Sequence, residues 1–141
     1  MSGDHTALEH TATARVRYGE TDQMGMVYHA NYFAYFEIGR TDLIRKYGMS
    51  YADLEARGVR LPVVEVDACF HEPARYDDEL LIETMLTALT GVRLRFEYRV
   101  TRASDDRLLA TGHTVLASLG ENGRPKRLPT DVRDSLGGEQ A

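Results

Sequence analysis

The segment from residue 18 to residue 32 holds the densest group of reactive side chains in the sequence. Asp22 and His29 lie in it on either side of Gly25. An aspartate with an ordinary pKa of about 3.9 is ionised at neutral pH, so it can attack an electrophile or take a proton from water. An aspartate in a loop can also simply accept hydrogen bonds from nearby backbone amides. Asp22 is therefore the first candidate for a catalytic group, with a turn-forming role as the alternative.

A long helix is predicted directly after this segment, over residues 31–46. Its apolar and small residues recur at the spacing of one helix face: Tyr32, Tyr35, Phe36, Gly39 and Leu43. The first backbone N–H groups of a helix have no intrahelical partner and carry the positive end of the helix dipole. A helix that begins near His29 therefore presents hydrogen-bond donors to an anion, at the mouth of the loop that bears Asp22.

The other predicted elements are mostly strands. Alternation predicts a first strand over residues 14–18, and Ser50 and Gly58 have the positions of caps for a short second helix between them. Period-two segments predict four further strands, over residues 64–70, 80–87, 92–100 and 108–119. The sequence thus predicts an α+β fold, in which an antiparallel sheet of about five strands wraps one long central helix. An unpaired edge strand of that sheet predicts at least a dimer.

Length and composition limit the class of protein. The 141 residues are enough for one domain, which we expect over residues 13–132, with flexible tails over residues 1–12 and 133–141. A net charge of −5 argues against nucleic acid as a partner. No segment is apolar enough for a membrane span or a signal peptide. The single cysteine, Cys69, excludes an internal disulfide and is typical of a reducing compartment, so we expect a cytoplasmic protein.

Motifs for metals and nucleotides are absent from the sequence. His71 and His113 have no second histidine or glutamate at a ligand spacing, so no metal or other cofactor is expected. The sequence also lacks a P-loop, a dinucleotide-binding glycine motif and a Gly-x-Ser-x-Gly motif. Glu37 is a competing carboxylate on the helix, but Arg40 three residues later predicts an ion pair instead.

Several sequence features occur together along residues 14–130. An aromatic residue lies four positions before Asp22, a glycine lies three after it, and a Val-Tyr-His sequence and an Asn-Tyr pair lead into the helix. These features are Tyr18, Gly25, Val27-Tyr28-His29 and Asn31-Tyr32, followed by Glu37, Arg40, Pro73-Ala74-Arg75, Asp78 and Leu128-Pro129. The combination resembles the 4-hydroxybenzoyl-CoA thioesterase family of the hotdog fold, in particular its bacterial acyl-CoA thioesterases associated with the Tol-Pal system.

The resemblance implies a hydrolase of acyl-CoA that needs no metal or organic cofactor. It implies that Asp22 is the catalytic carboxylate and that the backbone N–H of His29 polarises the thioester carbonyl. In the family the substrate lies between two protomers, so a homodimer or a homotetramer is implied. The residues expected in the site are, as catalytic groups, Asp22, His29 and Tyr18, and, as substrate-binding groups, Gly25, Val27, Tyr28, Asn31 and Tyr32.

Each of these residues also has a structural interpretation. Tyr18 faces the core in the predicted first strand, and His29 can cap or pack at the helix N-terminus. Gly25 is expected to adopt a positive φ or to allow a close ligand approach. A basic cluster follows the last strand: Arg124, Lys126 and Arg127. It predicts a solvated surface, with contact to coenzyme A phosphates as the functional alternative.

The expected chemistry suits a weak base. An aspartate of ordinary pKa can cleave a thioester because the thiol, with a pKa of about 8.5, leaves as a thiolate without a strong general acid. The same chemistry would serve a thioester on acyl carrier protein or an aromatic acyl-CoA. A protein that binds acyl-CoA without hydrolysing it is the remaining alternative.

Overall fold

The computed structural model describes residues 8–137 of the chain. Five strands, three α-helices and one 3-10 turn occur in the order β1 (Leu8–Arg15), η1 (Tyr18–Glu20), α1 (Asn31–Lys46), α2 (Tyr51–Ala56), β2 (Val63–Phe70), β3 (Glu79–Leu89), β4 (Arg93–Arg102), β5 (Leu108–Ala117) and α3 (Thr130–Ser135). The strands form one antiparallel sheet in the order β1-β3-β4-β5-β2. The predicted α+β fold with a five-stranded sheet is confirmed.

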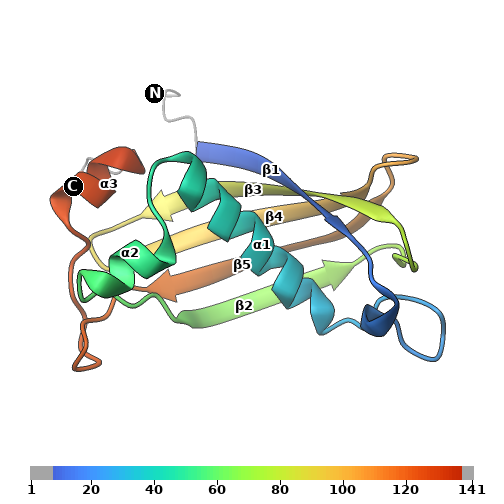
Figure 1. The fold of residues 1–141 in the computed structure, drawn as a ribbon, viewed down its shortest axis with the longest axis horizontal. Helices are drawn as coiled ribbons and strands as arrows, with labels where there is room; N and C mark the ends of the chain where they lie inside the picture. The colour runs from blue at the N-terminus through green and yellow to red at the C-terminus, as the bar shows by residue number, and fades with distance from the viewer. Residues whose placement is uncertain (1–7, 138–141) are drawn as a thin grey trace.

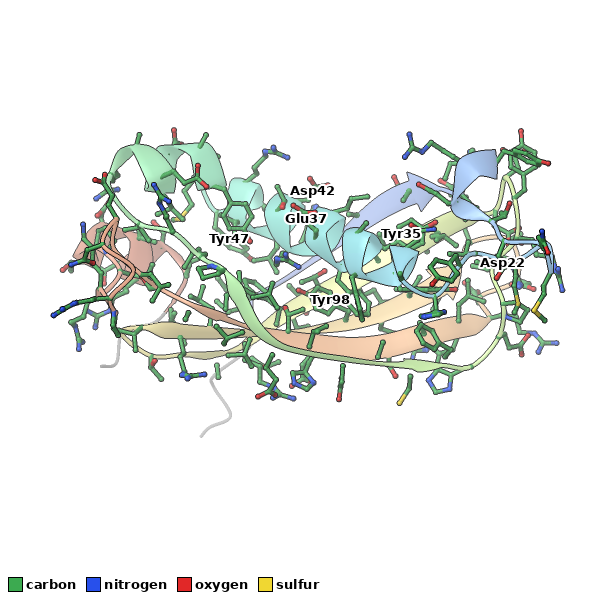
Figure 2. The ribbon with its side chains drawn as sticks, turned by 90° about the horizontal axis from the view of Figure 1, so that it is seen from below. Asp22, Tyr35, Glu37, Asp42, Tyr47 and Tyr98 are labelled. Atoms are coloured by element: carbon green, nitrogen blue, oxygen red, sulfur yellow. The ribbon has the colours of Figure 1, made fainter. Side chains whose placement is uncertain are left out.

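Helix α1 lies across one face of the sheet, and the sheet curves around it (Figures 1 and 2). All five residues of the predicted helix face are buried: Tyr32, Tyr35, Phe36, Gly39 and Leu43. The Phe36 ring stacks on the Tyr98 ring of β4, with centroids 4.3 Å apart. Burial of this stripe fixes the rotation of the helix on the sheet, and with it the direction in which its N-terminus points.

The helix caps follow the sequence prediction. Gly48 and Gly58 adopt φ values of 96° and 85° after α1 and α2, in the left-handed region that glycine enters without a steric penalty. The hydroxyl of Ser50 accepts a hydrogen bond of 3.1 Å from the Asp53 N–H, which caps α2.

Strand β2 is the edge strand that helix α1 leaves uncovered. Apart from Ala68 its residues are all exposed. Val66 and Phe70 are 39% and 50% exposed, although they pair with the buried strand β5, and Val64 at the bulge before them is 51% exposed. Large apolar side chains are therefore open at the edge of the sheet.

The first strand and both ends of the chain differ from the prediction. The strand predicted over residues 14–18 begins at Leu8 and ends at Arg15, because it pairs with β3 along its whole length. The tail predicted over residues 1–12 was therefore wrong for residues 8–12, whereas residues 1–7 lie outside the described part. The alternation was missed because the helix-facing side of this strand carries small residues, such as the buried Ala12, and few large apolar ones.

The C-terminal tail predicted over residues 133–141 was wrong in its first part. Helix α3 continues to Ser135, and Leu136 after it is buried in the core. A single turn of helix held by Val132 and Leu136 is too short to give a clear periodic signal in the sequence. Residues 138–141 lie outside the described part.

Candidate active site

The loop between β1 and α1 is a compact turn that carries Asp22. Thr21 and Val27 form an isolated antiparallel bridge, and the Asp22 N–H donates to the Met26 carbonyl at 2.9 Å. The chain reverses at Gly25, whose N–H donates to the Asp22 carbonyl at 3.0 Å and whose φ is 80°. The positive φ predicted for Gly25 is thereby confirmed, and it explains why glycine stands at this turn.

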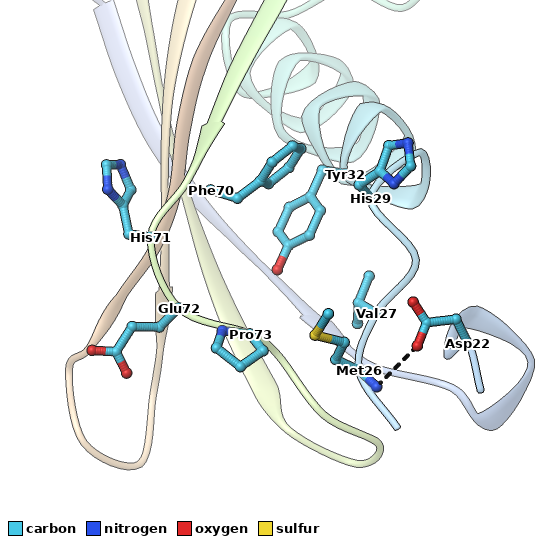
Figure 3. A pocket seen from close by; sticks show the side chains of 9 residues that line it. All are labelled: Asp22, Met26, Val27, His29, Tyr32, Phe70, His71, Glu72 and Pro73. Atoms are coloured by element: carbon cyan, nitrogen blue, oxygen red, sulfur yellow. Dashed lines mark hydrogen bonds between the residues drawn. The ribbon is translucent and has the colours of Figure 1, made fainter. Parts of the chain in front are cut away.

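The carboxylate of Asp22 uses one of its oxygens to hold this turn. Oδ1 accepts hydrogen bonds from the N–H groups of Met24 at 2.9 Å and Met26 at 3.5 Å. Oδ2 has no hydrogen-bond partner within residues 8–137 and is directed toward the side on which α1 begins (Figure 3). The second oxygen of a half-buried carboxylate is thus free to meet a ligand.

Helix α1 begins beside the loop that carries Asp22. Its first N–H bonds run from Asn31 to the Tyr28 carbonyl and from Tyr32 to the His29 carbonyl, at 2.9 Å and 3.1 Å. The N–H of His29 itself finds no hydrogen-bond acceptor in the described part of the chain. A helix N-terminus with a free donor favours an anion or a polarised carbonyl oxygen.

These groups share a cavity of about 290 Å³ at one end of the sheet. It is lined by Asp22, Met26, Val27, His29, Tyr32, Phe70, His71, Glu72 and Pro73 (Figure 3). The Phe70 ring of β2 lies 5.1 Å from the Tyr32 ring and 6.2 Å from the His29 ring, centroid to centroid. Burial raises the pKa of the Tyr32 hydroxyl, so it stays protonated at neutral pH. Asp22 and His29 therefore share the cavity with a wall of aromatic and apolar side chains and with two further polar residues, His71 and Glu72.

Two polar residues at the rim of the cavity are occupied elsewhere. The Glu72 carboxylate pairs with Arg107 at 2.6 Å, and the His71 ring lies 3.2 Å from the Thr111 hydroxyl, on the other side of its strand from Phe70 (Figure 3). Neither side chain is therefore placed to act together with Asp22.

Four of the eight residues predicted for the site line the cavity: Asp22, Val27, His29 and Tyr32. Three of the others have structural contacts: Gly25 in the turn, Tyr28 half-exposed with its ring 4.5 Å from that of His29, and Asn31 bonded through Nδ2 to the Glu20 carbonyl at 2.8 Å. The remaining residue, Tyr18, was placed wrongly. It lies in η1 rather than in the first strand, it is 77% exposed rather than core-facing, and its ring meets the edge of Tyr76.

Phe70 and Pro73 were missed as lining residues. Phe70 is the last residue of β2, and its sequence signal was only that of a strand. Its place in the cavity follows from the antiparallel order of the sheet, which brings the end of β2 beside the start of α1. No local pattern around residue 70 carries that information.

Two other sequence predictions change in the structure. No ion pair joins Glu37 and Arg40 in the part of the chain that is described. Arg40 is instead half-buried beside Tyr98 and Tyr51, whose hydroxyls hold its pKa above the ordinary value despite the burial. Glu37 is exposed on α1, away from the end that carries Asp22 (Figure 2).

The basic cluster of residues 124–127 lies at the opposite end of the sheet from the Asp22 loop (Figure 1). Lys126 there donates to the Arg57 carbonyl at 3.5 Å. Within one protomer the cluster therefore does not line the cavity that contains Asp22. Among residues 8–137 no three His, Cys, Asp or Glu side chains gather as a metal site would require. The helices within residues 8–137 are also too short or too polar to cross a membrane.

Comparison with known proteins agrees with this fold. Residues 16–136 match the thioesterase-like superfamily. The putative acyl-CoA thioesterase YneP of Bacillus subtilis is 41% identical over 85 residues. The match covers 60% of this chain and 62% of YneP, which is less than two thirds of that protein. The acyl-CoA thioester hydrolase YbgC of Escherichia coli is 34% identical over 118 residues, 84% of this chain and 88% of that one.

Among solved structures, the DHNA-CoA thioesterase from Staphylococcus aureus superposes with a TM-score of 0.89 at 29% identity, and the match covers 94% of this chain and 91% of that one. Fold and relatives together define the class of protein, a hotdog-fold thioesterase. The chain belongs to the thioesterase-like superfamily.

Proposed function

We propose that this enzyme hydrolyses an acyl-CoA thioester to a free carboxylic acid and coenzyme A, with Asp22 as its catalytic carboxylate. The observation that carries the proposal is that Asp22 and His29 line the same cavity, and that Oδ2 of Asp22 and the N–H of His29 both lack a hydrogen-bond partner within residues 8–137. The names of the two relatives, an acyl-CoA thioesterase and an acyl-CoA thioester hydrolase, support coenzyme A as the carrier.

The His29 N–H supplies the electrostatic part of the reaction. When the thioester carbonyl accepts this hydrogen bond, negative charge that develops on its oxygen meets the positive end of the α1 dipole. The donor belongs to the backbone and is fixed before substrate binds, so no reorganisation is needed during the reaction. In other enzymes the loss of one such donor lowers turnover by about 10²–10³-fold.

Asp22 supplies the other part, by one of two routes. As a general base, its carboxylate takes a proton from water while the hydroxide adds to the carbonyl carbon. The tetrahedral intermediate then expels the thiolate, which takes the proton back from Asp22. As a nucleophile, Oδ2 attacks the carbonyl, the thiolate leaves, and water hydrolyses the resulting anhydride. Both routes need only one free carboxylate oxygen, and a thiolate leaving group with a pKa of about 8.5 makes either feasible.

We propose that the active form is a homodimer, or a homotetramer built from such dimers. The support is strand β2, an edge strand whose Val64, Val66 and Phe70 are open to solvent. Phe70 also lines the cavity, so a second copy that pairs with β2 would complete the wall around the substrate. An exposed apolar edge of this kind otherwise favours aggregation.

The test is thiol release from a panel of thioesters. The panel contains acyl-CoA esters of graded chain length, an aromatic acyl-CoA and one acyl chain on acyl carrier protein. We expect turnover of at least one CoA ester and a higher kcat/KM for CoA than for the carrier protein with the same acyl group. Release from no thioester, with acyl-CoA retained by the protein, would instead show a binding protein.

A further inference from the structure

Glu20 ties the Asp22 loop to helix α1 through its backbone. Its carbonyl oxygen accepts two hydrogen bonds, one from the Tyr28 N–H at 2.9 Å and one from Nδ2 of Asn31 at 2.8 Å. Glu20 lies two residues before Asp22, and Tyr28 lies one residue before His29. This pair of bonds therefore sets the spacing between the two ends of the loop.

The side chain of Glu20 reaches the core of the protein. Its Oε1 accepts hydrogen bonds from the Tyr35 hydroxyl at 2.8 Å and from the Arg17 N–H at 2.9 Å. Tyr35 belongs to the buried face of α1 and is only 2% exposed, so close packing holds its hydroxyl in place. The loop is thus bonded to a rigid point of the helix.

The ionisation states of the pair favour this contact. Burial opposes the charge on Glu20, but the hydrogen bonds from Arg17 and Tyr35 outweigh it and lower the pKa of the carboxyl below its ordinary value. Burial and the neighbouring Glu20 carboxylate raise the pKa of the Tyr35 hydroxyl. The contact is therefore a hydrogen bond from a neutral phenol to a carboxylate, a charge-assisted type stronger than a neutral one.

We propose that Glu20 and Tyr35 are positioning residues of the hydrolase, and that their hydrogen bond holds the Asp22 carboxylate against the free N–H of His29. The inference rests on the proposed function. The turn itself is closed by its own bonds between residues 21 and 27. Its far end is also held, because Met26 is bridged to Arg75 and the Val27 N–H donates to the Ala74 carbonyl at 2.9 Å. Without the Tyr35 hydroxyl the near end, at Glu20, loses its side-chain bond to α1, so the loop can shift about these far-end contacts. A misplacement of about 1 Å at a reacting group can cost about 10²-fold in rate.

The test compares Tyr35→Phe with Tyr98→Phe as a matched control. Like Tyr35, Tyr98 is buried, and its ring stacks on Phe36 of α1. Its hydroxyl also makes a hydrogen bond, of 2.6 Å with the Thr114 hydroxyl, but it lies away from the Asp22 loop. For Tyr35→Phe we expect kcat to fall about tenfold or more with KM changed less than about twofold, and the Tyr28 amide to exchange faster with solvent. Tyr98→Phe should keep the wild-type kcat and the wild-type exchange rate at Tyr28.

A second pair of variants guards against a folding defect in Tyr35→Phe. Glu20→Ala removes the acceptor from a side chain that is 18% exposed, and Glu20→Gln keeps an acceptor oxygen for Tyr35. The proposal predicts that kcat of Glu20→Gln exceeds that of Glu20→Ala at equal folded fraction. The positioning role is overturned if Glu20→Gln and Glu20→Ala have equal kcat, or if Tyr35→Phe and Tyr98→Phe do. The proposed function still stands in that case, provided that Asp22→Asn is inactive. If Asp22→Asn is as active as the wild type, the proposed function fails and this inference fails with it.

Discussion

Asp22 uses one carboxylate oxygen for structure and leaves the other for the chemistry that we propose. Oδ1 holds the turn through the Met24 and Met26 amides, and Oδ2 stays free in the cavity. The sequence presented a turn-forming aspartate and a catalytic one as alternatives, but the geometry makes the two roles compatible. A side chain pinned at one oxygen loses little further freedom when the other oxygen reacts, which favours catalysis.

At the residue scale, the lowered pKa of Glu20 predicts a pH-dependent contribution to stability. A carboxyl whose folded-state pKa lies below its unfolded value of about 4.5 stabilises the fold above that value and loses this effect as the pH falls through the folded-state pKa. Glu20→Gln should therefore lower the free energy of unfolding by about 1 kcal/mol at pH 7 and by much less near pH 3. Urea unfolding of both proteins at the two pH values measures the difference. An equal difference at both values contradicts the assignment.

Residues that lie close together in the sequence could be predicted for the site, and distant ones could not. Asp22, Val27, His29 and Tyr32 fall within eleven consecutive positions, and each lines the cavity. Phe70 reaches it from another strand, through a long-range arrangement that no local spacing reveals. Tyr18 was misplaced because a 3-10 turn interrupts the alternation that seemed to continue from the first strand.

At the element scale, the position of α1 on the sheet depends on a close approach at Gly39. A Cβ at this position would overlap the Thr84 hydroxyl and would lie 2.8 Å from Cγ2 of Ile82, both on β3. Gly39→Ala gains helix propensity of about 1 kcal/mol but forces these buried side chains to move. We expect a net loss of about 1–2 kcal/mol in the free energy of unfolding, from overpacking.

Gly19→Ala is the control for this effect. A Cβ at Gly19 meets nothing within 4 Å, so the free energy of unfolding should change by less than about 0.5 kcal/mol. Chemical denaturation of both variants gives the comparison. If Gly39→Ala is as stable as Gly19→Ala, α1 is not held at the distance that the structure requires.

The elements themselves differed in how strongly the sequence signalled them. Helix α1 was predicted over the residues that form it, because five buried residues repeat at helical spacing. Strand β1 was shifted by six residues at its start, since its one buried residue, Ala12, is small. Propensity and periodicity detect an element that buries large side chains, whereas β1 is defined by its pairing with β3.

At the scale of the whole molecule, the open edge at β2 predicts the effect of a charge placed there. Val66 lies on this edge strand, on the same side of it as Phe70, and is 39% exposed. Val66→Glu should convert the proposed dimer to a monomer, because an unpaired charge would be buried in the interface. It should also lower kcat/KM, since Phe70 on the same strand lines the cavity. Sedimentation equilibrium and thiol release measure the two effects.

The control for this surface is Glu55→Lys, on the exposed side of α2. It also changes the charge of the molecule but leaves β2 untouched, so mass in solution and activity should both stay at the wild-type values. A fully active wild-type monomer would contradict the assignment of β2 to the interface.

The central claim is that the free oxygen of Asp22 does the chemistry, and Asp22→Asn tests it most directly. The asparagine oxygen can still accept from the Met24 and Met26 amides, so the turn is retained, but the second position becomes an NH₂ group with no basic lone pair. Acyl-CoA binding by calorimetry and single-turnover thiol release are measured on the same preparation. The account predicts a Kd for acyl-CoA within about threefold of the wild-type Kd, which is measured before the wild type hydrolyses the ligand. It also predicts a loss of about 10²-fold or more in the hydrolysis rate. An unchanged hydrolysis rate in a folded Asp22→Asn protein would contradict it.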